Sequence, residues 1–189
     1  MATRPAAPAP ARATVPVWDR AVRVIHWALA LTCAAAWVTT ETGLRWHEPL
    51  GYAALALVGA RFVWGFAGSR YARFTQFMRG PRATLRYAAQ VRRGDAPRHL
   101  GHNPLGGWMA AALWTGVALL GLTGWLYTTD AFWGEAWLDQ LHEVLGWSLL
   151  GLVALHIAGV VHTSRTQGEN LVAAMLSGRK RAPRDGDVT

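Results

Sequence analysis

Apolar residues are gathered into four long stretches of the chain, and the segments between them hold most of the charged residues. The stretches run from about Val22 to Thr40, Pro49 to Phe66, Leu105 to Tyr127 and Leu141 to Val161. Each is close to the ~20 residues that a helix needs to cross the hydrocarbon core of a bilayer. Because a helix satisfies its own backbone hydrogen bonds in lipid, the pattern predicts an all-α membrane protein, built as a four-transmembrane-helix bundle.

The composition agrees with membrane insertion and argues against a soluble nucleic-acid-binding protein. Hydrophobic residues make up 52% of the chain and charged residues only 16%, and the net charge is +8. A strong positive charge can indicate nucleic-acid binding. Here, however, the arginines flank the apolar stretches, which is where basic residues set the orientation of a membrane protein. We therefore expect contact with membrane lipid and no nucleic-acid partner.

The basic residues are concentrated on one side of the predicted membrane. They lie before the first stretch, between the second and the third, and after the fourth, whereas the other two connections carry a single basic residue, Arg45. The residues on the basic side include Arg4, Arg12, Arg20, Arg23, Arg70, Arg73, Arg79, Arg82, Arg86, Arg92, Arg93, Arg98, Arg165, Arg179, Lys180, Arg181 and Arg184. By the positive-inside rule, both termini are predicted to be cytoplasmic.

Three segments outside the apolar stretches complete the predicted organisation. Residues 1–17 are rich in proline and alanine and are expected to form a disordered cytoplasmic tail. Within the membrane domain, residues 18–166, the middle connection over residues 70–100 is predicted to form an amphipathic helix on the inner membrane surface. Its apolar side would be made by Phe74, Phe77, Met78, Leu85 and Tyr87. Residues 167–189 are expected to form a cytoplasmic C-terminal tail.

Four histidines lie at or inside the ends of the predicted spans, where ionisable side chains are costly and tend to be functional. His26 lies near the cytoplasmic end of the first span, and His47 lies at the outer start of the second. His142 and His156 are fourteen residues apart on the fourth span, which is about 21 Å of helix rise and nearly four full turns. These two side chains are therefore predicted to share one helix face at opposite membrane depths.

A helix that carries two histidines at different depths can offer one axial ligand to each of two stacked haems. The depths pair His26 with His156 at the inner level and His47 with His142 at the outer level. Imidazole is a common ligand of haem iron, and two per iron leave no open position, which favours electron transfer. The single cysteine, Cys33, excludes a C-x-x-C-H attachment. We therefore expect two non-covalent b-type haems.

Two other interpretations of these histidines stay open on spacing alone. A histidine at a helix end is often an interfacial residue with no ligand. A histidine-lined metal carrier is the second alternative, although such a site would be expected to group histidine with Asp or Glu at mid-depth, where this chain has no carboxylate.

Four motifs extend the interpretation over about residues 18–180. They are R-V-I-H-W at 23–27, H-E-P-L-G-Y at 47–52, G-H-N-P-L-G-G at 101–107, and L-H-E-V-L-G-W through A-L-H-I-A-G-V-V-H across 141–162. These motifs resemble the bacterial cytochrome b561 family, whose superfamily includes the b-type cytochrome subunits of nickel hydrogenases and formate dehydrogenase. The resemblance implies a bacterial inner-membrane protein in which His26 and His156 ligate the cytoplasmic-side haem and His47 and His142 the periplasmic-side haem.

The resemblance also implies a function. Family members typically pass electrons between the membrane quinone pool and a periplasmic redox partner such as a cytochrome c, so we expect an electron carrier or oxidoreductase component rather than a stand-alone catalyst. Two alternatives stay open within the same fold: a membrane-anchor subunit of a hydrogenase or dehydrogenase complex, and a superoxide:quinone oxidoreductase. Formation of a homodimer is also open.

Three further residues are candidates for contacts with cofactor or substrate. Arg61 lies fourteen residues after His47, at the inner depth, where its guanidinium could bind a haem propionate or extend to the cytoplasmic surface. His102 and Asn103 precede the third span, and the resemblance to formate dehydrogenase cytochromes implies a quinone site there. Asn103 is also suited to cap the third helix, because Pro104 follows it, and the cap is compatible with a quinone contact.

Overall fold

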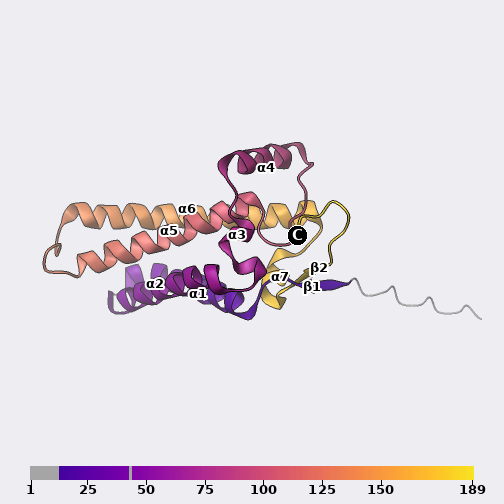
Figure 1. Ribbon diagram of the computed structural model, residues 1–189. Coiled ribbons are helices and arrows are strands. Elements are labelled where there is room, and N and C mark those ends of the chain that lie inside the picture. The colour runs from indigo at the N-terminus through magenta and orange to yellow at the C-terminus, as the bar shows by residue number, and fades with distance from the viewer. Residues whose placement is uncertain (1–12, 43) are drawn as a thin grey trace, which may run out of the picture.

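Four long helices run alongside one another in the computed structural model, which describes residues 13–42 and 44–189 (Figure 1). They are α1 (Arg20–Thr42), α2 (Leu44–Ala67), α5 (Pro104–Tyr127) and α6 (Ala136–Gln167). The closely packed pairs among them are α1 with α2, α2 with α5, and α5 with α6. All four are long and apolar enough to cross a membrane, which confirms the predicted all-α bundle.

The apolar side chains of the four helices point mostly outwards. Of the residues in each membrane-spanning segment, no more than 17% are buried inside the protein. Large apolar side chains such as Leu31, Phe62 and Trp147 are more than half exposed. A surface of this kind is stable in lipid and not in water. The chain is therefore a multi-pass membrane protein.

The shorter elements gather at one end of the bundle, together with both ends of the described chain (Figure 1). They are β1 (Thr14–Pro16), η1 (Arg70–Ala72), α3 (Phe74–Phe77), α4 (Pro81–Arg93), α7 (Leu171–Ser177) and β2 (Arg179–Arg181). β1 pairs with β2 in antiparallel register, with Thr14 opposite Arg181. We call this end of the bundle the terminal end.

The two terminal segments are more ordered than the sequence predicts. The expected disordered tail, residues 1–17, falls partly outside the described residues, but its last part forms β1, and Val17 is only 4% exposed. The expected C-terminal tail forms α7 and β2 instead. The two segments pair with each other as β1 and β2. In addition, Val17 and Trp18 pack with Val22, Ala72 and Leu100 in one buried cluster, and Met175 packs against it.

The middle connection is also different from the single amphipathic helix that the sequence predicts. It is divided into η1, α3 and α4, and α4 begins at Pro81, with Gly80 as its N-cap. Proline cannot continue a preceding helix, because it lacks a backbone N–H and disfavours helical geometry in the residue before it. Phe77 and Tyr87, which were expected on the lipid-facing side, are buried within the protein, whereas Leu85 is 71% exposed.

Candidate functional site

The four span histidines meet in two pairs at different heights of the bundle. At the terminal end, the imidazole rings of His26 on α1 and His156 on α6 have their centroids 6.5 Å apart. Further along the bundle, the ring centroids of His47 on α2 and His142 on α6 lie 6.1 Å apart. We call these the inner pair and the outer pair. The structure thus brings together the same residues that helix spacing pairs.

The separation within each pair fits a metal held between two imidazoles. With N–metal bonds of about 2.0–2.1 Å and ~1.1 Å from each ring centre to its nitrogen, the two centroids would lie about 6.3 Å apart. Among the described residues, no group of three or more His, Cys, Asp or Glu could hold a metal. Protein zinc sites need three or four such ligands, whereas a haem supplies four of its own. The donor set therefore fits haem iron.

The two helices that carry each pair are not packed closely against one another. Each pair includes a histidine of α6, yet among the four long helices α6 packs closely only with α5. The side chains of α6 therefore face α1 and α2 without close backbone packing. At Gly124 on α5, an added Cβ would lie 3.3 Å from Cε1 of His142, so this glycine lets α5 approach the outer pair closely.

The outer pair is fixed by hydrogen bonds from its ring nitrogens. Nδ1 of His47 lies 2.9 Å from the carbonyl oxygen of Ala36 on α1. Nδ1 of His142 lies 2.8 Å from the hydroxyl of Thr123 on α5. These contacts come from two further helices, so all four helices contribute to this level of the bundle.

Among the described residues, no such contact is found for the ring nitrogens of the inner pair. Nδ1 of His26 is buried with no hydrogen-bond partner, and the His26 ring meets the ring of its neighbour Trp27 edge-on at 5.1 Å. A buried polar atom without a partner is costly and calls for an explanation. A group bound beside the inner pair could give this nitrogen a partner.

Arg61 is one of three buried charged residues in the part of the chain that the structure describes. It is only 4% exposed, so it does not extend to the surface, which was one of its two expected roles. Nη2 donates to the carbonyl of Ala72 at 3.0 Å, and the guanidinium lies over the ring of Trp114 at 4.7 Å. Nη1 is buried and has no partner. A free N–H donor on a buried cation fits an anionic group such as a propionate.

The residues before α5 are held by local contacts. The side chain of Asn103 caps α5, because its Oδ1 accepts from the backbone N–H of Gly106 at 2.7 Å. The ring of His102 lies 4.8 Å from the rings of both Trp18 and Phe77. Nδ1 of His102 is buried and unpartnered. Burial, assisted by the positive charges of Arg61 and Lys180, lowers the pKa of His102 to about 3, so its imidazole is neutral at neutral pH.

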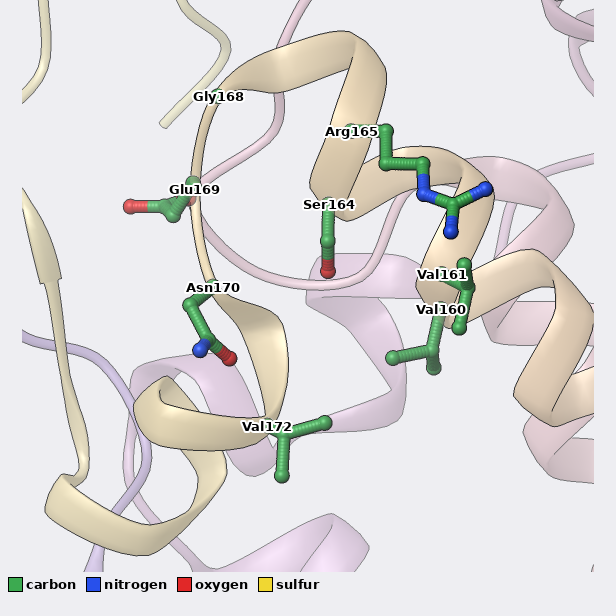
Figure 2. A pocket seen from close by; sticks show the side chains of 8 residues that line it. All are labelled: Val160, Val161, Ser164, Arg165, Gly168, Glu169, Asn170 and Val172. Atoms are coloured by element: carbon green, nitrogen blue, oxygen red, sulfur yellow. The ribbon is translucent and has the colours of Figure 1, made fainter.

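A pocket of about 390 Å³ opens at the terminal end, one helical turn beyond His156. It lies between the end of α6 and α7, and Figure 2 shows Ser164, Asn170 and Val172 pointing towards the hollow, with Glu169 pointing away from it. Ser164 and Asn170 both use their side-chain oxygens to accept backbone N–H groups at the start of α7. The pocket is thus built by the turn between the two helices.

Sequence reasoning missed the contacts made between distant parts of the chain. The only feature of the sequence that could have indicated the contact of Thr123 is its hydroxyl group within an apolar span. The ring pair of Trp37 and Trp147, with centroids 5.0 Å apart, had no signal, because both residues are ordinary in membrane helices. At the terminal end, Arg98 and Lys180 both bind Glu169, with N–O distances of 2.7 and 3.3 Å.

The chain is similar to one protein family and to two named proteins. The model of a family described as prokaryotic cytochrome b561 matches residues 17–178. A probable Ni/Fe-hydrogenase B-type cytochrome subunit of Bradyrhizobium diazoefficiens is 23% identical, over 89% of this chain and 87% of that protein. A protein of the same description from Rhodobacter capsulatus is 26% identical, over 89% of this chain and 82% of its own. No solved structure gives a significant match.

Proposed function

Because this chain belongs to the prokaryotic cytochrome b561 family, a family of membrane b-type cytochromes that carry electrons, we propose that it holds two haems and passes electrons through the bundle. The observation that carries the proposal is the pair of histidine pairs, with ring centroids 6.5 and 6.1 Å apart. Both are close to the spacing of a bis-imidazole iron, and α6 contributes one residue to each.

The inner pair would hold one haem and the outer pair the other. A haem iron bound by two imidazoles supplies a one-electron Fe(III)/Fe(II) couple with no open coordination position. The residues of this chain would bind and orient each haem and exclude water from it. Nη1 of Arg61, buried and free, would bind a propionate of the inner haem.

We propose that the terminal end faces the cytoplasm. The support is the distribution of charge, because the segments at this end carry nearly all the arginines and the single lysine of the chain. The connections at the other end carry Glu48, Asp130, Glu135 and Asp139 and, among basic residues, Arg45 alone. The inner pair would then lie on the cytoplasmic side and the outer pair on the periplasmic side.

The electron partners proposed for the two ends are a quinone and a periplasmic redox protein. The loop at His102 and Asn103 is the proposed quinone site, and its free polar atom is Nδ1 of His102 rather than the capping oxygen of Asn103. With its pKa lowered to about 3, His102 would hydrogen-bond the quinone and would not store a proton at neutral pH. A periplasmic cytochrome c is the proposed partner at the other end.

A second function is favoured by the comparisons. Both named relatives are described as probable Ni/Fe-hydrogenase B-type cytochrome subunits, and each matches over most of its length. The chain could therefore serve a hydrogenase or dehydrogenase complex as its membrane subunit, with the outer haem accepting electrons from that enzyme. Purification from native membranes separates the two functions, because a subunit would bring the large enzyme with it.

The haem content of the purified protein tests the proposal. We expect a dithionite-reduced spectrum with sharp low-spin b-type bands, two haems per chain by pyridine haemochrome assay, and two components in a redox titration. A spectrum without these bands, or a full complement of one haem per chain, would contradict it. Metal analysis that found stoichiometric zinc and no iron would support the metal-carrier alternative instead.

A further inference from the structure

The inner and outer pairs differ in what their ring nitrogens bind. Both Nδ1 atoms of the outer pair are in hydrogen bonds, His47 with the carbonyl of Ala36 and His142 with the hydroxyl of Thr123. Nδ1 of His26 in the inner pair is buried without a partner. We propose that Thr123 and the Ala36 carbonyl are positioning groups that hold the two outer imidazoles with the proton on Nδ1, which leaves the lone pair of each Nε2 available to bind iron.

The direction of the His47 contact is fixed by its partner. A backbone carbonyl oxygen can only accept a hydrogen bond. The 2.9 Å contact with Ala36 therefore requires that Nδ1 of His47 carries the proton and donates it. A neutral imidazole protonated on Nδ1 has its lone pair on Nε2. This contact also ties α2 to α1 beside the connection between them, so the ring cannot turn without breaking it.

The direction of the Thr123 contact follows from the other neighbours of its hydroxyl. Oγ1 lies 2.9 Å from the carbonyl oxygen of Leu119 and 3.2 Å from that of Leu120. A carbonyl oxygen can only accept a hydrogen bond, so the hydroxyl group of Thr123 uses its single proton to donate to these carbonyls. Oγ1 is then left to accept from Nδ1 of His142 at 2.8 Å. Thr123 is 5% exposed, so water does not compete for this bond.

Both outer ligands are therefore prepared to bind iron through Nε2. Hydrogen bonding from the second ring nitrogen fixes the orientation of a metal-bound histidine and makes it a stronger electron donor. A stronger donor favours Fe(III) over Fe(II), so it lowers the reduction potential of the haem. This inference rests on the proposed haem function, and it assigns Thr123 to the affinity and the potential of the outer haem.

Substitutions of Thr123 can separate a hydrogen-bonding role from a packing role. Thr123→Val keeps the shape of the side chain and removes the hydroxyl, whereas Thr123→Ser keeps the hydroxyl and removes a methyl group. We expect Thr123→Val to shift the midpoint potential of the outer haem upwards and to weaken its binding about tenfold or more. Thr123→Ser should behave like the wild type. The inner haem should be unchanged in both variants, which also shows that each variant folds.

The opposite pattern would overturn the inference. If Thr123 acts by packing, Thr123→Val should leave the outer haem unchanged and Thr123→Ser should perturb it. An equal shift of both haems in Thr123→Val would also contradict the assignment. The matched control is Thr115→Val on the same helix, because Thr115 is exposed. If the haem proposal itself is wrong, the wild-type protein will lack a second haem, and this outcome is distinct from any effect of the Thr123 variants.

Discussion

His26 and His156 place their imidazole rings 6.5 Å apart on two helices, α1 and α6, that are not among the closely packed pairs of the described bundle. Side chains alone therefore span the distance at this level. The outer pair has the same property, because α2 packs closely on α1 and α5 and not on α6. The haems proposed above would lie between α6 and the first two helices.

The pairing predicts which haem each histidine variant loses. His26→Ala and His156→Ala should each remove the inner haem, and His47→Ala and His142→Ala should each remove the outer haem, because one imidazole cannot hold a bis-histidine iron. The haem-to-protein ratio should fall from two to one in every case, and redox titration identifies the haem that remains. His162→Ala is the control, since His162 is exposed. Loss of the same haem from His142→Ala and His156→Ala would refute the two-level pairing.

Arg61 should affect the inner haem and not the outer one. Replacing it with glutamine removes a positive charge that is only 4% exposed, and a buried positive charge near a haem stabilises its Fe(II) form electrostatically. We expect Arg61→Gln to lower the midpoint potential of the inner haem, measured by spectroelectrochemistry. Arg86→Gln is the control, because Arg86 is exposed on α4.

A lysine at the same position tests the propionate contact more closely. Arg61→Lys keeps the charge but loses the planar fork that binds a carboxylate with two parallel bonds. The potential should therefore recover in part, while the inner haem should still dissociate faster than in the wild type. An inner haem that is indifferent to all Arg61 variants would leave the residue with its structural role alone, the bond to Ala72.

Much of this site could be predicted from the sequence, because the information is local to single helices. The fourteen-residue spacing of His142 and His156 follows from helix rise and turn, and the order of the spans places His26 and His47 at their depths. The Thr123–His142 bond could not be predicted, because it depends on how α5 and α6 are rotated about their axes. Periodicity within one helix does not encode that rotation.

The terminal end was the least predictable part of the fold. The sequence pattern predicts tails over residues 1–17 and 167–189, because neither segment holds an apolar run long enough to cross a membrane. In the described residues 13–17 and 167–189, order comes from contacts over long sequence separations, such as Val15 opposite Lys180 and Arg98 bonded to Glu169. Charged residues that the positive-inside rule explains individually are, in this case, also partners in a buried network.

Asn103 caps α5 in the structure, and we also propose that it contacts a quinone. Two variants separate these roles. Asn103→Ala removes the cap, which costs about 1 kcal/mol, and also removes the amide. Asn103→Asp keeps an oxygen that accepts from the N–H of Gly106, but it has no N–H to donate. If the amide donates to a quinone, both variants should slow haem reduction by quinol in stopped-flow experiments with both haems still bound. Slowing in Asn103→Ala alone would assign the effect to the cap.

The ion pairs of Glu169 should stabilise the terminal end. Its side chain and those of Arg98 and Lys180 are each no more than 7% exposed. Glu169→Ala leaves the buried Lys180 without its carboxylate and leaves Arg98 paired with Asp187 alone, and breaking a buried pair in this way costs roughly 3–5 kcal/mol. We expect faster proteolysis of the C-terminal segment and a lower thermal unfolding temperature in detergent. Asp95→Ala is the control, because the Arg93–Asp95 pair is exposed and should contribute less than about 1 kcal/mol.

The same network predicts how the terminal end responds to acid. Burial alone would raise the pKa of Glu169, but hydrogen bonds from Arg98 and the charge of Lys180 hold it below its ordinary value of 4.5. A carboxylate with a lowered pKa in the folded state contributes stability that is fully present above its unfolded pKa and is lost as the pH falls through the folded one. Resistance of the C-terminal segment to an acid-active protease should therefore be constant near neutral pH and decline below about pH 4.5. Glu169→Ala should show a weaker decline, because the variant has already lost this contribution. Equally steep acid profiles in the wild type and the variant would show that other carboxylates, such as Asp187, control the transition.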